Sequence, residues 1–125
     1  MNGPQVGFAD KKVRSQCSLD CHVLILLADG FDEIEALSIL TALRDAGFAV
    51  KSAGVTEGAV RGLHGIAFLP DLNLKDLRAS VDMSTVQIVV LPKGEPSLVR
   101  LGIEPEVQTI LRRVLDQRQG LVVTD

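Results

Sequence analysis

The sequence predicts a single doubly wound α/β domain, on three observations. Two apolar runs, 23–28 and 86–91, the second of which includes Gln87, are typical of strands buried on both faces of a parallel sheet. Each run is followed by a segment with apolar residues at helical spacing, 34–43 and 107–115. The length of 125 residues suits one core. Strands that alternate with helices in this way predict a flavodoxin-like three-layer sandwich with a mostly parallel sheet.

The elements of the first half follow from local signals. The helix over 34–43 is expected to show an apolar stripe to the core and to end near Gly47, which suits a C-terminal cap. Residues 48–55 then return as a second strand through a right-handed crossover. Residues 56–65 hold three glycines and predict a loop or hairpin, before a short strand at 66–69. The first apolar run is therefore expected to be the central strand.

The second half repeats the alternation. Asn73 is placed to cap a short helix that runs through Ala79. The second apolar run is stopped by a turn over 92–96, and Pro105 fits the first turn of the next helix. A last strand is expected at 121–123. The residues expected on the water-facing side of the last helix are Arg112, Arg113, Asp116, Gln117 and Arg118.

Composition excludes several classes of function. The chain has no Trp or Tyr on which bases could stack, and its net charge of −3 argues against nucleic acid and a basic membrane anchor. Its longest apolar run is too short for a bilayer, and its start does not resemble a secretory signal, so a cytoplasmic setting is expected. Residues 1–20 predict a flexible extension. Cys17 and Cys21 are interpreted as free thiols, and no cofactor or metal is expected.

The segment 29–35 places four carboxylates between the first strand and its helix. In the structural interpretation, Asp32 caps the helix and Glu35 reaches back to complete a capping box. In the functional interpretation, Glu35 points into the cleft at the strand ends, where partial burial would raise its pKa for proton transfer. The two roles are compatible.

Two further positions have weaker signals. Gly94, after the second apolar run, could let a backbone N–H face a developing oxyanion, although a plain turn explains it too. His64 could act as a base, but no carboxylate or thiol partner is near it in sequence, so a surface or interface histidine is favoured. His22, at the head of a strand, is interpreted as a surface residue.

Residues 23–36, VLILLADGFDEIEA, resemble the opening of the ThiJ/PfpI family. Later blocks agree in order and spacing, and the resemblance covers Cys21 to Asp125. Those blocks are 44–47, 50–55, 62–71, 89–92 and 120–121. The resemblance implies a fold akin to class I glutamine amidotransferases, a homodimer or larger assembly, and a role in stress response. It also implies cofactor-free, cysteine-dependent glyoxalase, deglycase or hydrolase chemistry, with a small carbonyl metabolite as substrate.

Residue roles also follow from this resemblance. Glu35 matches the glutamate that supports the nucleophilic thiol, and Gly94 matches a glycine whose N–H lines the pocket. Lys93 departs from the family pattern, which has glycine there. The nucleophilic cysteine would be the residue after Asp125, so domain 21–125 is interpreted as truncated before the nucleophile elbow.

The expected function is therefore that of a family member which is inactive alone. Its partner would be a second copy or a missing C-terminal part. Cys17 and Cys21 precede the first strand and belong at the opposite edge of the sheet, so neither is expected to replace the nucleophile. The alternative is a non-catalytic dimerisation or protein-binding module.

Overall fold

The computed structural model describes residues 20–124, apart from the side chain of Arg78. The flexible extension predicted over 1–20 thus lies outside the described residues except for Asp20, and Asp125 lies outside them too. The core is a five-stranded sheet in the order β5-β2-β1-β6-β7, in which every neighbouring pair is parallel. The strands are β1 (Val23–Leu27), β2 (Val50–Gly54), β5 (Leu72–Asn73), β6 (Ile88–Leu91) and β7 (Gly120–Val123). The expected parallel sheet with the first strand at its centre is confirmed.

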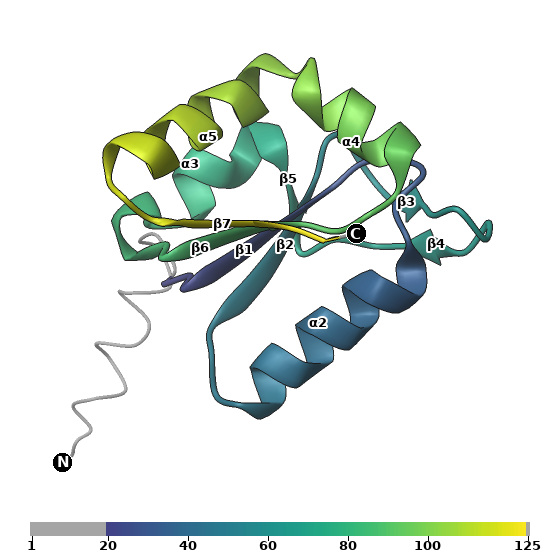
Figure 1. The fold of residues 1–125 in the computed structure, drawn as a ribbon, viewed down its shortest axis with the longest axis horizontal. Coiled ribbons are helices and arrows are strands. Elements are labelled where there is room, and N and C mark those ends of the chain that lie inside the picture. The colour runs from purple at the N-terminus through teal and green to yellow at the C-terminus, as the bar shows by residue number, and fades with distance from the viewer. Residues whose placement is uncertain (1–19, 125) are drawn as a thin grey trace, which may run out of the picture.

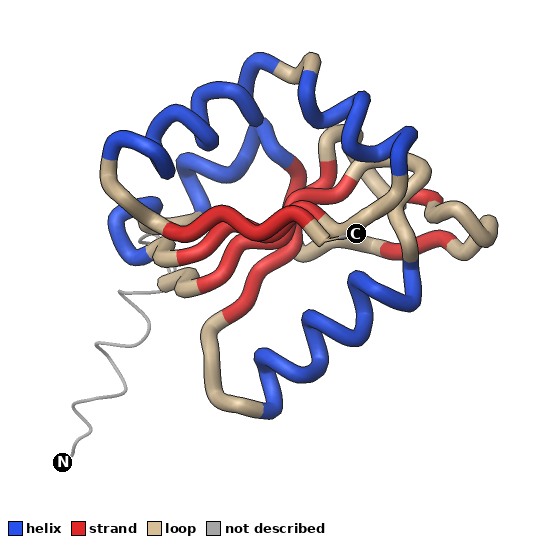
Figure 2. Tube along the Cα trace, viewed as in Figure 1, coloured by secondary structure: helices blue, strands red, loops and turns tan. Residues whose placement is uncertain are grey.

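Helices cover both faces of the sheet and complete three layers (Figure 1). Helix α2 (Glu33–Asp45) lies alone on one face, and α3 (Leu77–Ser80), α4 (Glu95–Gly102) and α5 (Pro105–Asp116) lie on the other (Figure 2). Two short 3₁₀ turns, η1 (Leu74–Asp76) and η2 (Met83–Thr85), flank α3. A separate antiparallel hairpin, β3 (Val60–Arg61) with β4 (Ala67–Phe68), lies beyond the carboxyl ends of the strands (Figure 1). None of the helices within residues 20–124 is long and apolar enough to cross a bilayer.

All five residues of β1 are buried, and alternate side chains enter different cores. Leu24 and Leu26 pack into the core under α3 and α5, whereas Val23, Ile25 and Leu27 pack into the core under α2. This two-sided burial explains why the strand is a continuous apolar run rather than an alternating one.

The predicted stripe of α2 is partly wrong. Its buried residues are Glu33, Ala36 and Leu40, while Ile34 is 66% exposed and Leu37 is also exposed. Glu33 in the first turn takes a place in the buried face of the helix, together with Ala36 and Leu40, and its carboxylate is held there by hydrogen bonds from the loop at 64–66. The consequence is an exposed apolar strip on α2.

Several predicted boundaries also differ. The turn expected over 92–96 is shorter, because Glu95 already begins α4, with Pro96 in its first turn. The strands expected at 48–55 and 66–69 are β2 and β4, each shortened at both ends, and β5 was not predicted. The helix expected after Asn73 is confirmed as η1 followed by α3, with Asn73 Oδ1 accepting from Asp76 N at 3.3 Å.

On α5, Arg113 is not on the water-facing side as expected. It is half-buried, and its Nε is buried without a hydrogen-bond partner. The helix buries Val107, Ile110 and Val114, so Arg113 stands directly beside its buried stripe. Leu115, expected on that stripe, is 73% exposed.

Candidate functional site

The ends of three parallel strands meet at one edge of the sheet. Asp32 N, after β1, donates to the carbonyl oxygen of Lys93, after β6, at 2.8 Å. Lys93 N in turn donates to Thr124 Oγ1, after β7, at 2.8 Å. Ligands of parallel α/β sheets bind at this edge, so the convergence predicted from the sequence defines a candidate site.

Gly94 lies at the point of closest approach between two of these segments. Its φ is +130°, and a Cβ there would lie 2.3 Å from the carbonyl oxygen of Gly30 and 2.8 Å from Phe31 Cα. Gly94 is also the N-cap of α4, and no side chain caps that helix. Its role as a backbone donor to a reacting group remains a prediction, but the position admits only glycine without strain.

Asp32 caps α2 as expected, because its Oδ1 accepts from Glu35 N at 3.0 Å. The reciprocal half of the capping box is not formed, since Asp32 N is already used by the Lys93 carbonyl. Glu35 is half-buried, and within residues 20–124 its carboxylate has no hydrogen bond or ion pair. Within the described part of the chain the Glu35 carboxylate therefore has its acceptor capacity free.

Glu33 is the residue that sequence reasoning missed. Its side chain is only 2% exposed, and Oε2 accepts from the backbone N–H groups of His64 at 2.9 Å and Ile66 at 3.0 Å. His64 Nδ1 lies 2.6 Å from Oε1. Gly62 makes the close approach possible, since a Cβ there would lie 2.1 Å from Glu33 Cδ. The three glycines of 56–65 were the available signal, because a loop that receives a buried group often needs such a residue.

Glu33 and His64 shift each other's pKa values in opposite directions. Burial by itself would raise the pKa of the Glu33 carboxyl, but hydrogen bonds from His64 and Ile66 outweigh it and lower the pKa to about 2. The Glu33 carboxylate raises the pKa of His64 above its ordinary value of 6.5, first by the hydrogen bond and then by its charge. The absence of a partner for His64 near in sequence was misleading, because its partner lies 31 residues earlier.

Backbone bonds fix the same loop to the turn after β1. Gly30 N donates to Arg61 O at 2.8 Å, and Leu63 N donates to Phe31 O at 2.8 Å. Asp29 Oδ1 accepts from Arg61 N at 3.0 Å. These bonds, together with those to Glu33, fix the hairpin to the segment that follows β1.

Cys21 lies at the amino end of β1, across the sheet from the candidate site. It is fully buried, its Sγ donates to Val23 O at 3.2 Å, and burial raises its pKa to about 11. A buried thiol of this kind is a poor nucleophile. Cys17 lies outside the described residues. Within 20–124, no three His, Cys, Asp or Glu side chains are grouped closely enough to hold a metal ion.

A parallel sheet with helices on both faces and polar groups at its strand ends defines a flavodoxin-like α/β protein. The chain belongs to the DJ-1/PfpI family, whose pattern it matches over residues 21–124. The resemblance noted from residues 23–36 is thereby confirmed.

Two curated relatives support the assignment. Deglycase TK1284 of Thermococcus kodakarensis is 36% identical over 81 residues, which cover 64% of this chain and 46% of the relative. Protein DJ-1 homolog A of Arabidopsis thaliana is 39% identical over 75 residues, covering 59% of this chain and 18% of the relative. The match thus takes in less than half of each relative.

Solved structures give the same fold. Drosophila melanogaster DJ-1beta superimposes with a TM-score of 0.74 at 27% identity, covering 84% of this chain and 55% of that one. Toxoplasma gondii DJ-1 in its oxidized form gives a TM-score of 0.73 at 25% identity, covering 82% and 54%. This chain spans about half the length of these relatives.

Replacing Gly94 by alanine tests the close approach at the strand ends. The added Cβ would meet the Gly30 carbonyl, so Gly94→Ala is expected to lower the free energy of unfolding by about 2 kcal/mol or more. Gly102→Ala is the control, because nothing lies within 4 Å of its Cβ position at the end of α4. That change is expected to be neutral or to stabilise by about 0.5–1 kcal/mol. Urea unfolding of both variants measures the contrast, and equal effects would contradict it.

The Glu33–His64 pair predicts a defined pH window of stability. The His64 pKa is raised by folding, so its contribution is full below pH 6.5 and declines as the pH rises through the folded pKa. The Glu33 pKa is lowered, so its contribution is present above pH 4.5 and is lost as the pH falls towards 2. The pair should therefore stabilise the fold most between pH 4.5 and 6.5.

An NMR titration of His64 measures the coupling directly. The midpoint is expected above 6.5 in the unaltered chain and nearer 6.5 in Glu33→Gln. Glu57→Gln is the control, because Glu57 is an exposed carboxylate that pairs with Lys75 elsewhere on the surface. A His64 midpoint that Glu33→Gln leaves unchanged would rule out the coupling.

Proposed function

We propose that this chain supplies the supporting half of a cysteine-dependent deglycase or glyoxalase site for small carbonyl compounds. In this proposal the reactive thiol is neither Cys17 nor Cys21, the two cysteines of this sequence, so the chain alone is inactive. The observation that carries the proposal is the Glu35 carboxylate, half-buried at the strand ends and free of any hydrogen bond or ion pair within residues 20–124.

The chemistry that Glu35 would perform is support of a thiol. A carboxylate within hydrogen-bond reach of a cysteine can take the proton that the thiol loses when it becomes a thiolate, and can orient the sulfur. Asp32 is committed to the helix cap and Glu33 to the hairpin, so Glu35 is the carboxylate of this turn left for that task. The deglycase name of the Thermococcus relative supports the reaction class for this chain.

The position of the described thiol supports the second half of the proposal. Cys21 is buried at the amino edge with a pKa of about 11, whereas Glu35 and Gly94 belong to the carboxyl edge. A nucleophile must lie beside both its acid and its oxyanion donor, so Cys21 cannot use either group.

A methylglyoxal-consumption assay tests the requirement for an external thiol. The purified chain is expected to consume methylglyoxal no faster than the same chain carrying Cys17→Ser and Cys21→Ser. Activity that the double substitution removes would place the nucleophile within this chain and overturn the proposal.

A chimera tests the role of Glu35. Residues 21–124 would be joined to the part of the Thermococcus deglycase that follows its matched region. The chimera is expected to consume methylglyoxal, and Glu35→Gln to reduce the rate by about 10²-fold or more. Glu57→Gln, on the exposed surface, is the control that should leave the rate unchanged. Iodoacetamide labelling against pH should show a raised thiol pKa in Glu35→Gln; a normal rate and pKa would exclude Glu35.

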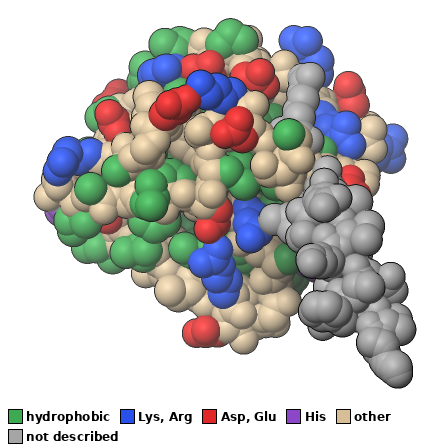
Figure 3. All heavy atoms as spheres, turned by 180° about the vertical axis from the view of Figure 1, so that it is seen from behind, with side chains coloured by type: hydrophobic (Ala, Val, Ile, Leu, Met, Phe, Trp, Pro, Cys, Tyr) green, Lys and Arg blue, Asp and Glu red, His purple; other side chains and the backbone are tan. Residues whose placement is uncertain are grey.

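A second candidate function, a dimerisation or protein-binding module, is favoured by an exposed apolar patch. Ile34 on α2 is 66% exposed, and Leu63, Ile66 and Leu69 of the hairpin region are exposed as well. Seen from behind, apolar side chains gather on the side of the molecule that carries the hairpin (Figure 3). Contiguous apolar surface of this kind marks interaction sites, and a homodimer is the assembly proposed here.

Sedimentation of charge variants tests the homodimer. Ile34→Glu and Ile66→Glu are expected to shift the chain from dimer to monomer, because each buries a charge in the proposed interface. Leu115→Glu is the matched control. Leu115 is exposed too, but it lies on α5, which covers the opposite face of the sheet from α2. A chain that is monomeric before any substitution would exclude the homodimer.

A further inference from the structure

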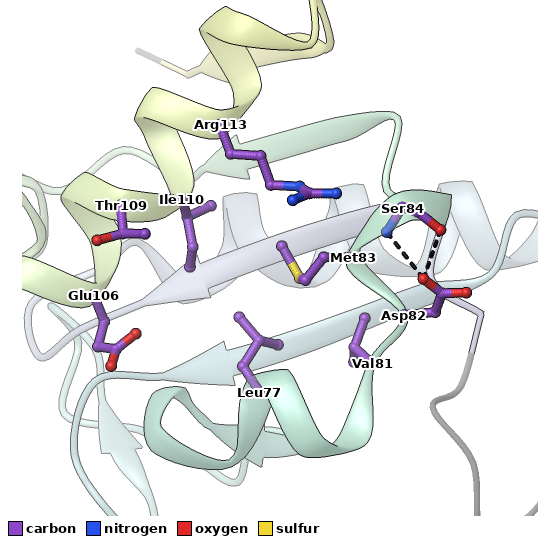
Figure 4. A pocket seen from close by; sticks show the side chains of 9 residues that line it. All are labelled: Leu77, Val81, Asp82, Met83, Ser84, Glu106, Thr109, Ile110 and Arg113. Atoms are coloured by element: carbon purple, nitrogen blue, oxygen red, sulfur yellow. Dashed lines mark hydrogen bonds between the residues drawn. The ribbon is translucent and has the colours of Figure 1, made fainter.

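A cavity of about 430 Å³ opens between α3, η2 and α5, away from the candidate site. Because η2 leads into the amino end of β6, the cavity lies towards the opposite edge of the sheet. Its floor is apolar and is made by Leu77, Val81, Met83 and Ile110 (Figure 4). The volume lies in the range of about 300–1,000 Å³ that small-ligand pockets have.

Arg113 points its guanidinium into this cavity (Figure 4). Its Nε is buried without a hydrogen-bond partner, and within residues 20–124 it forms no ion pair. A buried donor on a charged group is costly to leave unpaired. Within the described residues the cavity is therefore bordered by a guanidinium whose buried Nε has no acceptor and which forms no ion pair.

Asp82 lies in the same cavity but does not supply that acceptor. Its Oδ1 already accepts from Ser84 N at 3.0 Å and from Ser84 Oγ at 2.6 Å. These bonds are the main reason that the Asp82 pKa is lowered, and the charge of Arg113 contributes less. The charge of Arg113 thus acts on the Asp82 carboxylate, but the two side chains form no hydrogen bond or ion pair with each other.

Glu106 borders the cavity from the same helix, on the other side of Ile110 (Figure 4). It is exposed and has no ion pair within the described part of the chain. Seven residues separate it from Arg113, which is two helical turns or roughly 10 Å along the axis. The cavity therefore has a cationic donor and an anionic acceptor with an apolar floor between them.

We infer that this cavity binds a short zwitterionic peptide with apolar side chains, of dipeptide size. Its terminal carboxylate accepts hydrogen bonds from Arg113, its ammonium group pairs with Glu106, and its side chains cover the apolar floor. The site is independent of the strand-end chemistry proposed above.

Simpler ligands fit the charges less well. A plain anion would satisfy Arg113 but would meet the two carboxylates of Asp82 and Glu106. A plain cation would be repelled by Arg113, and a neutral apolar ligand would leave its guanidinium unpaired. A zwitterion of sufficient length is the class that places each charge beside its opposite.

Calorimetric titration of the full chain with leucyl-leucine tests the site. We expect saturable binding that weakens about tenfold or more for leucyl-leucinamide, which lacks the carboxylate, and for N-acetyl-leucyl-leucine, which lacks the ammonium. Arg113→Gln should weaken binding of leucyl-leucine about tenfold and leave that of the amide unchanged. Arg112→Gln, at the neighbouring exposed position, is the matched control and should bind normally.

Two results would overturn the inference. One is the absence of saturable leucyl-leucine binding to the folded chain. The other is equal binding of the dipeptide and its amide. If Arg113→Gln fails to fold, Glu106→Gln takes its place, since Glu106 is exposed. Glu106→Gln should weaken the binding of leucyl-leucine and leave the binding of N-acetyl-leucyl-leucine unchanged. The Met83 methyl NMR signal should shift on binding, and a shift elsewhere alone would place the ligand in another site.

Discussion

The burial of β1 from both faces and along both edges is the constraint on which the rest of the structure depends. Its backbone pairs with β2 on one side and β6 on the other, and its side chains enter two separate cores. A strand held in this way fixes where its carboxyl end emerges. The turn from Asp29 to Asp32 therefore meets the segment after β6. Position 94 must be glycine, because a side chain there would collide with the Gly30 carbonyl oxygen.

Three of the four carboxylates in segment 29–35 have different fates. Asp32 caps α2, Glu33 is buried in the hairpin loop, and Glu35 keeps its oxygens free. Spacing alone predicted the cap, because capping is a local interaction. It could not predict that Asp32 N would be taken by Lys93, nor that Glu33 would be covered by residues 62–66. The free state of Glu35 is thus a product of tertiary structure.

Charge and burial divide the molecule into two edges with different chemistry. Glu35 and Gly94 follow β1 and β6 at the carboxyl edge, whereas the described thiol, Cys21, is buried at the amino edge with a raised pKa. The cavity beside α5 lies towards the amino edge as well, where Arg113 lacks an acceptor. The two regions share no residues, so the proposed carbonyl chemistry and the proposed peptide site are separable functions.

The sequence by itself determined the class of fold, the central strand and the family, because apolar runs, helix caps and the order of strands and helices are signals carried by neighbouring residues. It also singled out Glu35 and Gly94, whose roles stay predictions. Only the tertiary structure decided the burial of Glu33 against His64, the exposure of Ile34 on α2, and the inward direction of Arg113. Each of these depends on hydrogen bonds or packing between residues far apart in the chain, for which no sequence spacing carries a signal.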